Sequence, residues 1–188
     1  MNAIFKMFFY LFGWKIAGRI PYEVKKGVFA VCPHNTWKDF FLGIGVRAAL
    51  KLNIGYFGKE ELFKPPFGFI FRWLGGTPTV RNKNTNLVAS HVEAINKAED
   101  KLFALAPEGT RKNVSKLKTG FYYMAHGAGI PIIMVGFDFE SKEVKLAEPF
   151  YPSGDYKEDM KKYFVPFFEN IGGFQKDWIK NYKNNIFE

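Results

Sequence analysis

The segment Gly27-Val28-Phe29-Ala30-Val31-Cys32, followed at once by Pro33-His34-Asn35-Thr36-Trp37-Lys38-Asp39, sets the architecture of this chain. Its first six residues form a short apolar run with β-branched members, which is typical of a buried strand. Pro33 disfavours continuation of that strand, and Asp39 opens a new apolar-rich run over 40–50. The segment therefore predicts a strand over 27–32, a turn that carries His34, and then a helix.

His34 and Asp39 stand five positions apart in this segment and are candidates for a catalytic pair. Imidazole is well suited to move a proton at neutral pH, and a nearby carboxylate holds its tautomer and orientation. Residues five apart on a regular helix point in different directions, so residues 35–38 must form a turn that brings Asp39 back onto His34. The alternative is that Asp39 is an ordinary helix N-cap.

Strands and helices are expected to alternate along the rest of the chain. The apolar patterns predict strands over 52–57, 77–80, 102–106, 132–137 and 144–147, and helices over 40–50, 84–98, 120–126 and 155–170. This alternation is typical of an α/β fold, here a single domain over 22–188 with a central, mostly parallel sheet flanked by helices. At 188 residues the chain can bury a core without disulfides, and the lone Cys32 is expected to be buried and inert.

Residues 1–21 are predicted to form a short amphipathic helix that contacts a membrane. The segment is rich in aromatic residues, with Lys6, Lys15 and Arg19 between them, and its uncharged run over 7–14 is shorter than the roughly 20 residues of a spanning helix. Bulky rings and cations suit a helix that lies in the membrane interface. The alternative is a helix that packs on the core of its own domain. A second aromatic-rich segment, 60–73, is a candidate for membrane contact or for an acyl-chain groove.

The composition is unusual in its aromatic residues and its charge. The chain contains 22 Phe, 9 Tyr and 4 Trp, which indicates membrane contact or, alternatively, an AT-rich genome. Its net charge of +9 attracts anions such as nucleic acid, phospholipid headgroups or phosphorylated small molecules. The three histidines and one cysteine match no metal-ligand spacing, so we expect no metal site.

A second cluster of polar residues, Pro107-Glu108-Gly109-Thr110-Arg111, follows the strand predicted over 102–106. It would therefore lie at the carboxyl edge of the sheet, where the sites of open α/β folds gather. Glycine permits close backbone approach to a ligand, and arginine suits phosphate. Arg81 ends another predicted strand and would reach the same edge as His34. The arrangement favours a proton-transfer enzyme with a phosphorylated substrate, and the alternative is a solvated basic face.

The pattern His34-x-x-x-x-Asp39, followed about seventy residues later by Pro107-Glu108-Gly109-Thr110-Arg111, resembles the glycerolipid (lysophosphatidic acid, PlsC-like) acyltransferase family. Gly75-Gly76-Thr77-Pro78-Thr79-Val80-Arg81 is similar to the family's acceptor-binding block. Gly129-Ile130-Pro131-Ile132-Ile133 is similar to its fourth, proline-containing block. The four blocks occur in the family's order and span roughly residues 28–150.

The resemblance implies a role for each matching residue. His34 would be the general base that takes the proton from the acceptor hydroxyl, and Asp39 would orient it. The hydroxyl would attack an acyl thioester directly, without an acyl-enzyme. The substrate-binding residues would be Arg81 at the acceptor's phosphate, Glu108 and Gly109 positioning acceptor and donor, and Thr110 and Arg111 in the same block. No cofactor is expected, and acyl-CoA or acyl carrier protein would be the co-substrate.

The resemblance also implies partners and a location. The acceptor would be 1-acyl-sn-glycerol-3-phosphate, giving phosphatidic acid. Val80 and the Trp37-Lys38 turn depart from the family pattern, so a lyso-amino-acid lipid or glycerol-3-phosphate stays open as acceptor. We expect the protein on the cytoplasmic face of the cell membrane as a peripheral or monotopic protein, bound to the anionic surface and not to nucleic acid. The non-enzymatic alternative is a basic module that binds anionic membranes or nucleic acid.

Overall fold

The computed structural model describes residues 2–79, 87–173 and 177–187 of the chain. Within these residues a seven-stranded sheet has the order β1-β7-β6-β2-β5-β3-β4. Its neighbours pair in parallel, except that β6 and β7 form an antiparallel hairpin. This confirms the predicted α/β fold with a mostly parallel sheet. The strands are β1 (Lys15–Ala17), β2 (Lys26–Cys32), β3 (Ile54–Lys59), β4 (Gly76–Thr79), β5 (Lys101–Leu105), β6 (Ile132–Asp138) and β7 (Glu143–Leu146).

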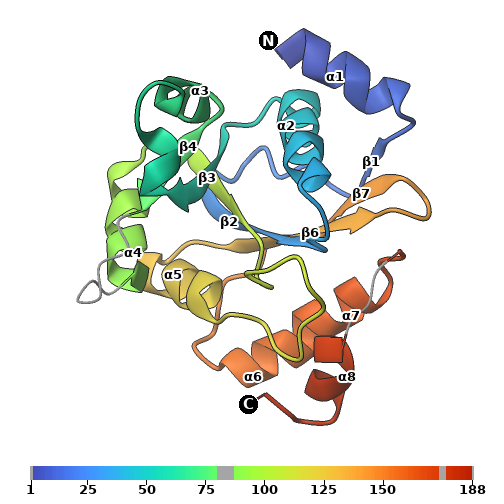
Figure 1. The fold of residues 1–188 in the computed structure, drawn as a ribbon. Helices are drawn as coiled ribbons and strands as arrows, with labels where there is room; N and C mark the ends of the chain where they lie inside the picture. Colours follow the sequence, from blue (N-terminus) through green and yellow to red (C-terminus); the bar gives the residue numbers. More distant parts are fainter. Residues whose placement is uncertain (1, 80–86, 174–176, 188) are drawn as a thin grey trace.

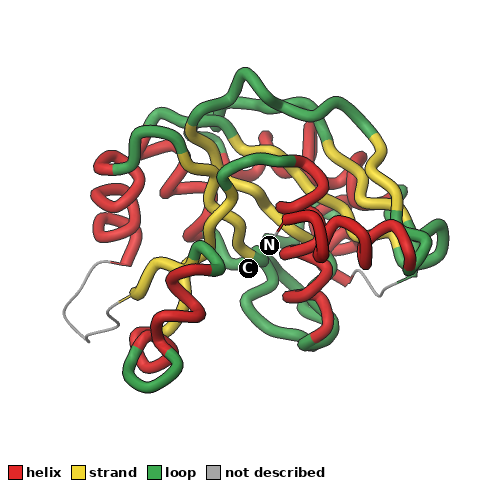
Figure 2. Tube along the Cα trace, turned by 90° about the horizontal axis from the view of Figure 1, so that it is seen from above, coloured by secondary structure: helices red, strands yellow, loops and turns green. Residues whose placement is uncertain are grey.

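Helices lie on both faces of this sheet (Figure 1). One face carries α1 (Asn2–Leu11) and α2 (Lys38–Leu50). The other carries α4 (Leu87–Lys97), α5 (Gly120–Ala128) and the C-terminal helices α6 (Tyr156–Asp159), α7 (Val165–Glu169) and α8 (Asp177–Lys183). A π-helical turn, η2 (Met160–Phe164), joins α6 to α7, and η1 (Glu60–Phe63) and α3 (Gly68–Trp73) precede β4. Seen from above, the strands run through the middle of the molecule with helices around them (Figure 2).

The central strand β2 contributes to two separate cores. Val28, Ala30 and Cys32 pack in the core beneath α4, α5 and the C-terminal helices, whereas Phe29 packs in the core beneath α1 and α2. Successive side chains of a strand point to opposite faces of the sheet. A strand that is buried on both faces is apolar at every position rather than at every second one, which explains the continuous apolar run. Because β2 pairs with both β5 and β6, the turn that follows it lies at the centre of the sheet edge.

The N-terminal segment differs from the prediction. Its helix ends at Leu11, and Lys15–Ala17 form the edge strand β1, which pairs in parallel with β7. The helix predicted over 1–21 is therefore too long. Gly13 has a φ of 79°, a left-handed conformation that ends the helix at low cost. The backbone groups that follow then pair with β7 instead of continuing a helical ladder.

The C-terminal segment is also more broken than predicted. The single helix expected over 155–170 consists of α6, η2 and α7, and α8 was not predicted at all. Helix α8 is a short element that packs Trp178, Ile179 and Tyr182 into the core, so its position depends on tertiary contacts rather than on a long periodic pattern. Among the helices that the structure describes, none combines the length and apolar character that a bilayer crossing needs.

Candidate active site

The turn between β2 and α2 brings His34 and Asp39 together. His34 Nδ1 lies 3.4 Å from Asp39 Oδ2, and the Asp39 side chain is 3% exposed whereas that of His34 is 32% exposed. The turn is closed by the same carboxylate, which accepts the backbone N–H groups of Asn35 at 2.6 Å and Thr36 at 2.8 Å. The Thr36 hydroxyl donates to its other oxygen at 3.0 Å. The structure thus has the turn that the pair requires, with a buried carboxylate behind an accessible imidazole.

Asp39 is not the N-cap of α2, the alternative that the sequence left open. Trp37 occupies the N-cap position and makes no side-chain capping bond. An N-cap side chain accepts N–H groups that follow it, whereas the Asp39 carboxylate accepts those of Asn35 and Thr36, which precede it. The carboxylate therefore shapes the turn that presents His34.

The surroundings of Asp39 keep it charged. Burial raises its pKa, but the contacts with His34, Thr36 and Asn35 outweigh burial and leave the pKa below its usual value. An ionised carboxylate beside Nδ1 stabilises a protonated imidazole. With Nδ1 directed at Asp39, the other ring nitrogen, Nε2, is the one left to exchange a proton with a substrate.

Glu108 joins the second predicted cluster to the first. It follows β5, which pairs with β2, so the two loops lie at the same edge of the sheet. Its side chain is 4% exposed, and Oε2 accepts the backbone N–H of His34 at 2.7 Å. The pKa of Glu108 is raised to about 6, chiefly by burial and also by the charge of Asp39. The hydrogen bond from the His34 N–H and the charge of His34 act in the opposite direction and lower the pKa. This buried side chain therefore holds the turn that carries His34.

The rest of the second cluster forms a tight turn at the surface. Gly109 has a φ of 65°, and a Cβ there would lie 3.1 Å from Cγ of Lys118. The backbone N–H of Lys118 donates to the carbonyl of Pro107 at 2.8 Å, which brings this lysine beside the turn. Thr110 accepts the N–H of Lys112 at 3.3 Å, and Arg111 is exposed. The sequence pattern does not single out Lys118, because its contact with Pro107 joins residues eleven positions apart.

Two blocks of the sequence pattern remain, the one that ends at Arg81 and the one around Pro131. Arg81 and Val80 fall outside the residues that the structure describes. The block around Pro131 joins α5 to β6, and the Pro131 carbonyl accepts the N–H of Val28 at 2.9 Å. It therefore meets β2 near its beginning, at the edge of the sheet opposite to His34, where it supports strand pairing.

An apolar cavity of about 260 Å³, which we call the inner cavity, extends from the His34–Asp39 pair beneath α2. Arg47 and Leu74 are also among the residues that line it. Its walls come from β2, β3, β5, β6 and α2, and include Val31, Phe40, Gly43, Ile44, Ile54, Phe57, Ala104 and Phe137. The sequence alone does not reveal the inner cavity, because its apolar lining comes from five elements that are far apart along the chain.

Neither a nucleophilic thiol nor a metal cluster accompanies the pair in the part of the chain that the structure describes. Burial raises the pKa of the Cys32 thiol well above its usual value, and the charge of Glu108 adds to this, so the thiol stays protonated. Within the same residues, no group of three or more His, Cys, Asp or Glu side chains is placed to hold a metal ion.

Comparisons with known proteins agree with one another. A family model described as Acyltransferase matches residues 15–138. A 1-acyl-sn-glycerol-3-phosphate acyltransferase of Haemophilus influenzae is 31% identical in an alignment of 133 residues that covers 66% of this chain and 54% of the relative. The protein of the same name from Escherichia coli K12 is 27% identical over 144 residues, 72% of this chain and 58% of the relative. The chain thus spans little more than half the length of these two relatives.

A solved structure shares the fold. The crystal structure of PlsC, the 1-acyl-sn-glycerophosphate (LPA) acyltransferase from Thermotoga maritima, superposes with a TM-score of 0.62 at 20% identity. The match covers 93% of this chain and 80% of that one.

Proposed function

Because this chain belongs to the acyltransferase family, whose model matches residues 15–138, we propose that it transfers a fatty acyl group from an acyl thioester to the hydroxyl of a lysophospholipid. The donor is acyl-CoA or acyl carrier protein. The acceptor is 1-acyl-sn-glycerol-3-phosphate, and the product is phosphatidic acid. The observation that carries this proposal is the His34–Asp39 pair at the mouth of an apolar cavity that suits an acyl chain.

The proposed reaction is a direct transfer. His34 Nε2 removes the proton of the acceptor hydroxyl while the hydroxyl oxygen attacks the thioester carbonyl carbon. The carbon–sulfur bond then breaks, its electron pair goes to sulfur, and the leaving thiolate receives the proton from His34. Asp39 stabilises the imidazolium in between, and general-base assistance of this kind contributes about 10²–10⁴-fold in rate. A protonated Cys32 is consistent with a path that forms no acyl-enzyme.

The substrates are charged at one end and apolar at the other. The inner cavity, which contains His34, takes the acyl chain of the donor. The exposed Arg111 and Lys118 beside the turn of Glu108, together with Arg81, supply positive charge for the acceptor's phosphate. The protein works at the anionic cytoplasmic surface of the membrane, which suits its net charge of +9 and the exposed apolar side chains of α1.

Thiol release tests this function. Purified protein is mixed with acyl-CoA and 1-acyl-sn-glycerol-3-phosphate, and the thiol product is measured with a chromogenic reagent. His34→Ala is expected to lower kcat by at least about a hundredfold, because the general base is lost. His126→Ala is the matched control, since His126 contacts the carbonyl of Pro152 at the end of α5 and takes no part in the site. Full activity of His34→Ala, with its fold intact by circular dichroism, contradicts the mechanism.

A further inference from the structure

A second apolar cavity lies between α1 and α2, and we call it the outer groove. Its volume is about 670 Å³, within the roughly 300–1,000 Å³ of typical ligand sites. Lys38 and Asp39 mark the end nearest the catalytic turn. The remaining lining is almost entirely aromatic and aliphatic: Phe5, Phe8, Phe9, Phe12, Trp14, Phe41, Leu42, Gly45 and Phe139. Asp39 also lines the inner cavity, so the two cavities meet on either side of the first turn of α2.

One residue of α1 holds the walls of the outer groove together. Phe9 is buried, and its ring lies 3.2 Å from where a Cβ on Gly45 would be, so α1 and α2 approach closely at this point. The neighbouring rings of Phe8 and Phe12 stack on each other at 6.2 Å and stay accessible, Phe12 to 64%. A docked helix with accessible rings along a groove offers an apolar surface for a ligand.

We propose that the outer groove binds the acyl chain of the acceptor lysophospholipid. This inference rests on the function proposed above. A transfer between two acyl-bearing molecules brings two apolar chains to one hydroxyl, and the two cavities converge on the His34–Asp39 turn. Glycerol-3-phosphate has no chain and would leave the outer groove empty.

The lining residues decide which chain enters which cavity. The inner cavity includes His34, so the chain within it leads directly to the carbonyl that is attacked. The outer groove has Lys38 at its catalytic end, an exposed cation that suits the phosphate of the acceptor. Its other wall is α1, whose outward face exposes Met7 and Leu11, so a lipid can pass from a membrane into the groove along one apolar surface.

The test measures the KM of a series of acceptors that differ in acyl-chain length, with one and the same acyl donor. The series runs from glycerol-3-phosphate through lysophosphatidic acids of increasing chain length, each below its micelle concentration. Each methylene buried in the groove is expected to lower KM by about fourfold until the groove is full. Leu42→Trp narrows the outer groove. It is expected to raise the acceptor KM at least tenfold and to make this KM nearly independent of acceptor chain length. Donor KM should stay within about twofold.

Gly43→Leu is the matched variant, because it is the neighbouring residue on α2 and lines the inner cavity instead. It is expected to shift the donor preference to shorter chains and to leave the acceptor series unchanged. Should Leu42→Trp fail to fold, Phe8→Ala removes an accessible ring from the groove and is expected to weaken the dependence on acceptor chain length.

The outcomes separate this inference from the function on which it rests. Wild-type KM that is independent of acceptor chain length, or glycerol-3-phosphate used as well as the lysolipids, overturns the inference and leaves the acyltransferase proposal intact. The inference also fails if Leu42→Trp alters donor chain preference in the way expected of Gly43→Leu. Absence of thiol release with every acceptor overturns the proposed function itself.

Discussion

Asp39 is the residue on which the geometry of the site depends. Its carboxylate contacts the imidazole of His34, two backbone N–H groups of the turn and the hydroxyl of Thr36. It thus combines two tasks that are often divided between residues: it closes the loop and it orients the imidazole of His34. A change in the charge of residue 39 therefore also changes the hydrogen bonds that shape the turn.

Asp39→Asn tests this coupling. The amide cannot stabilise an imidazolium as a carboxylate does, and its NH₂ group cannot accept the backbone N–H groups of the turn. We expect kcat for acyl transfer to fall by about 10²–10⁴-fold, with a smaller change in KM. Thr36→Val removes one neutral hydrogen bond and should cost no more than about tenfold. Equal losses in the two variants, measured by thiol release, would show that the charge of Asp39 is unimportant.

The raised pKa of Glu108 predicts how the free energy of unfolding depends on pH. Its pKa is raised on folding to about 6 from an ordinary 4.5, chiefly by burial. An acid with a raised folded pKa destabilises the folded state above that pKa, and the effect disappears as the pH falls towards the ordinary value. Glu108→Gln should therefore be up to about 2 kcal/mol more stable than wild type near pH 8.

Urea unfolding of both proteins between pH 4.5 and pH 8 measures this difference. Glutamine keeps an oxygen that can accept the His34 N–H, so the comparison isolates the charge. The advantage of Glu108→Gln should shrink as the pH drops through about 6. A difference that stays constant across this range would contradict the assignment of the titration to Glu108.

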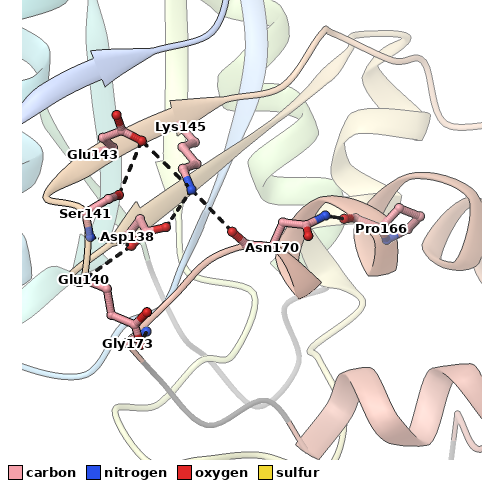
Figure 3. A network of polar contacts seen from close by, with 8 residues as sticks. All are labelled: Asp138, Glu140, Ser141, Glu143, Lys145, Pro166, Asn170 and Gly173. Atoms are coloured by element: carbon pink, nitrogen blue, oxygen red, sulfur yellow. Dashed lines mark hydrogen bonds and ion pairs between the residues drawn. The ribbon is translucent and has the colours of Figure 1, made fainter.

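The β6–β7 hairpin connects the sheet to the C-terminal helices (Figure 3). Asp138 accepts from Lys145 at 2.6 Å and from the backbone N–H groups of Glu140 at 3.1 Å and Ser141 at 3.0 Å. Lys145 reaches the carbonyl of Asn170 at 3.4 Å, and Glu140 accepts the N–H of Gly173 at 3.0 Å. The hairpin turn, the end of α7 and the segment after it are therefore held by one network.

Asp138→Ala should destabilise the protein by about 1.5–3 kcal/mol, the usual cost of losing hydrogen bonds to a charged group. Burial raises the pKa of Asp138, but Lys145 and the backbone N–H groups outweigh it, so the pKa is lowered. The stabilisation is thus present above the ordinary value of 3.8 and is lost as the pH falls through the folded pKa. Thermal unfolding at neutral pH measures the loss, and a variant as stable as wild type would show that the network is dispensable.

Helix α2 forms a wall of both cavities, and Gly43 shows how one of them can be altered. A Cβ at this position meets no atom within 4 Å, and Gly43 lines the inner cavity, so we expect a larger side chain here to reduce the volume of that cavity. Gly43→Leu should move the optimum donor to a shorter acyl chain, and helix propensity should favour the change by several tenths of a kcal/mol. Kinetics with acyl-CoA donors of different length measure the shift. An unchanged donor profile would mean that the chain lies elsewhere.

The whole molecule combines a basic charge with exposed apolar helices. Its net charge is +9, and on α1 the side chain of Leu11 is 71% exposed while Phe9 packs in the core. Membrane contact and packing on the domain, the two alternatives for the N-terminal segment, therefore do not exclude each other, because one side of α1 packs on the domain and the other is exposed. Such a helix suits the interface of an anionic membrane.

Vesicle flotation tests this surface. Binding to vesicles that contain anionic lipid should exceed binding to neutral vesicles and should weaken as salt is raised. Ile4→Glu with Leu11→Glu should reduce binding at least tenfold, because two apolar contacts are replaced by charges that the membrane repels. Tyr151→Glu, at an exposed aromatic residue outside α1, is the matched control. Equal binding by both variants would exclude α1 as the contact.

Local patterns were sufficient for most of the fold. Strands β2 and β6 are buried on both faces, and their continuous apolar runs predicted them to within a residue. Strand β1 and helix α8 were missed, because the first is three residues long and both depend on distant partners: β1 pairs with β7, and Trp178 of α8 packs in the core. Short elements carry too little periodicity to be recognised without those contacts.

The amino-acid sequence determined which chemical groups the candidate site contains: a histidine and an aspartate after a buried strand, and an acidic and a basic residue after another. Parallel strands end at the same edge, so the strand assignment already placed His34 and Glu108 near each other. The tertiary structure alone decided that Glu108 turns inward to the His34 backbone and that two apolar cavities meet at Asp39. The physical reason is that a cavity consists of the space left between packed elements, and no local pattern specifies that space.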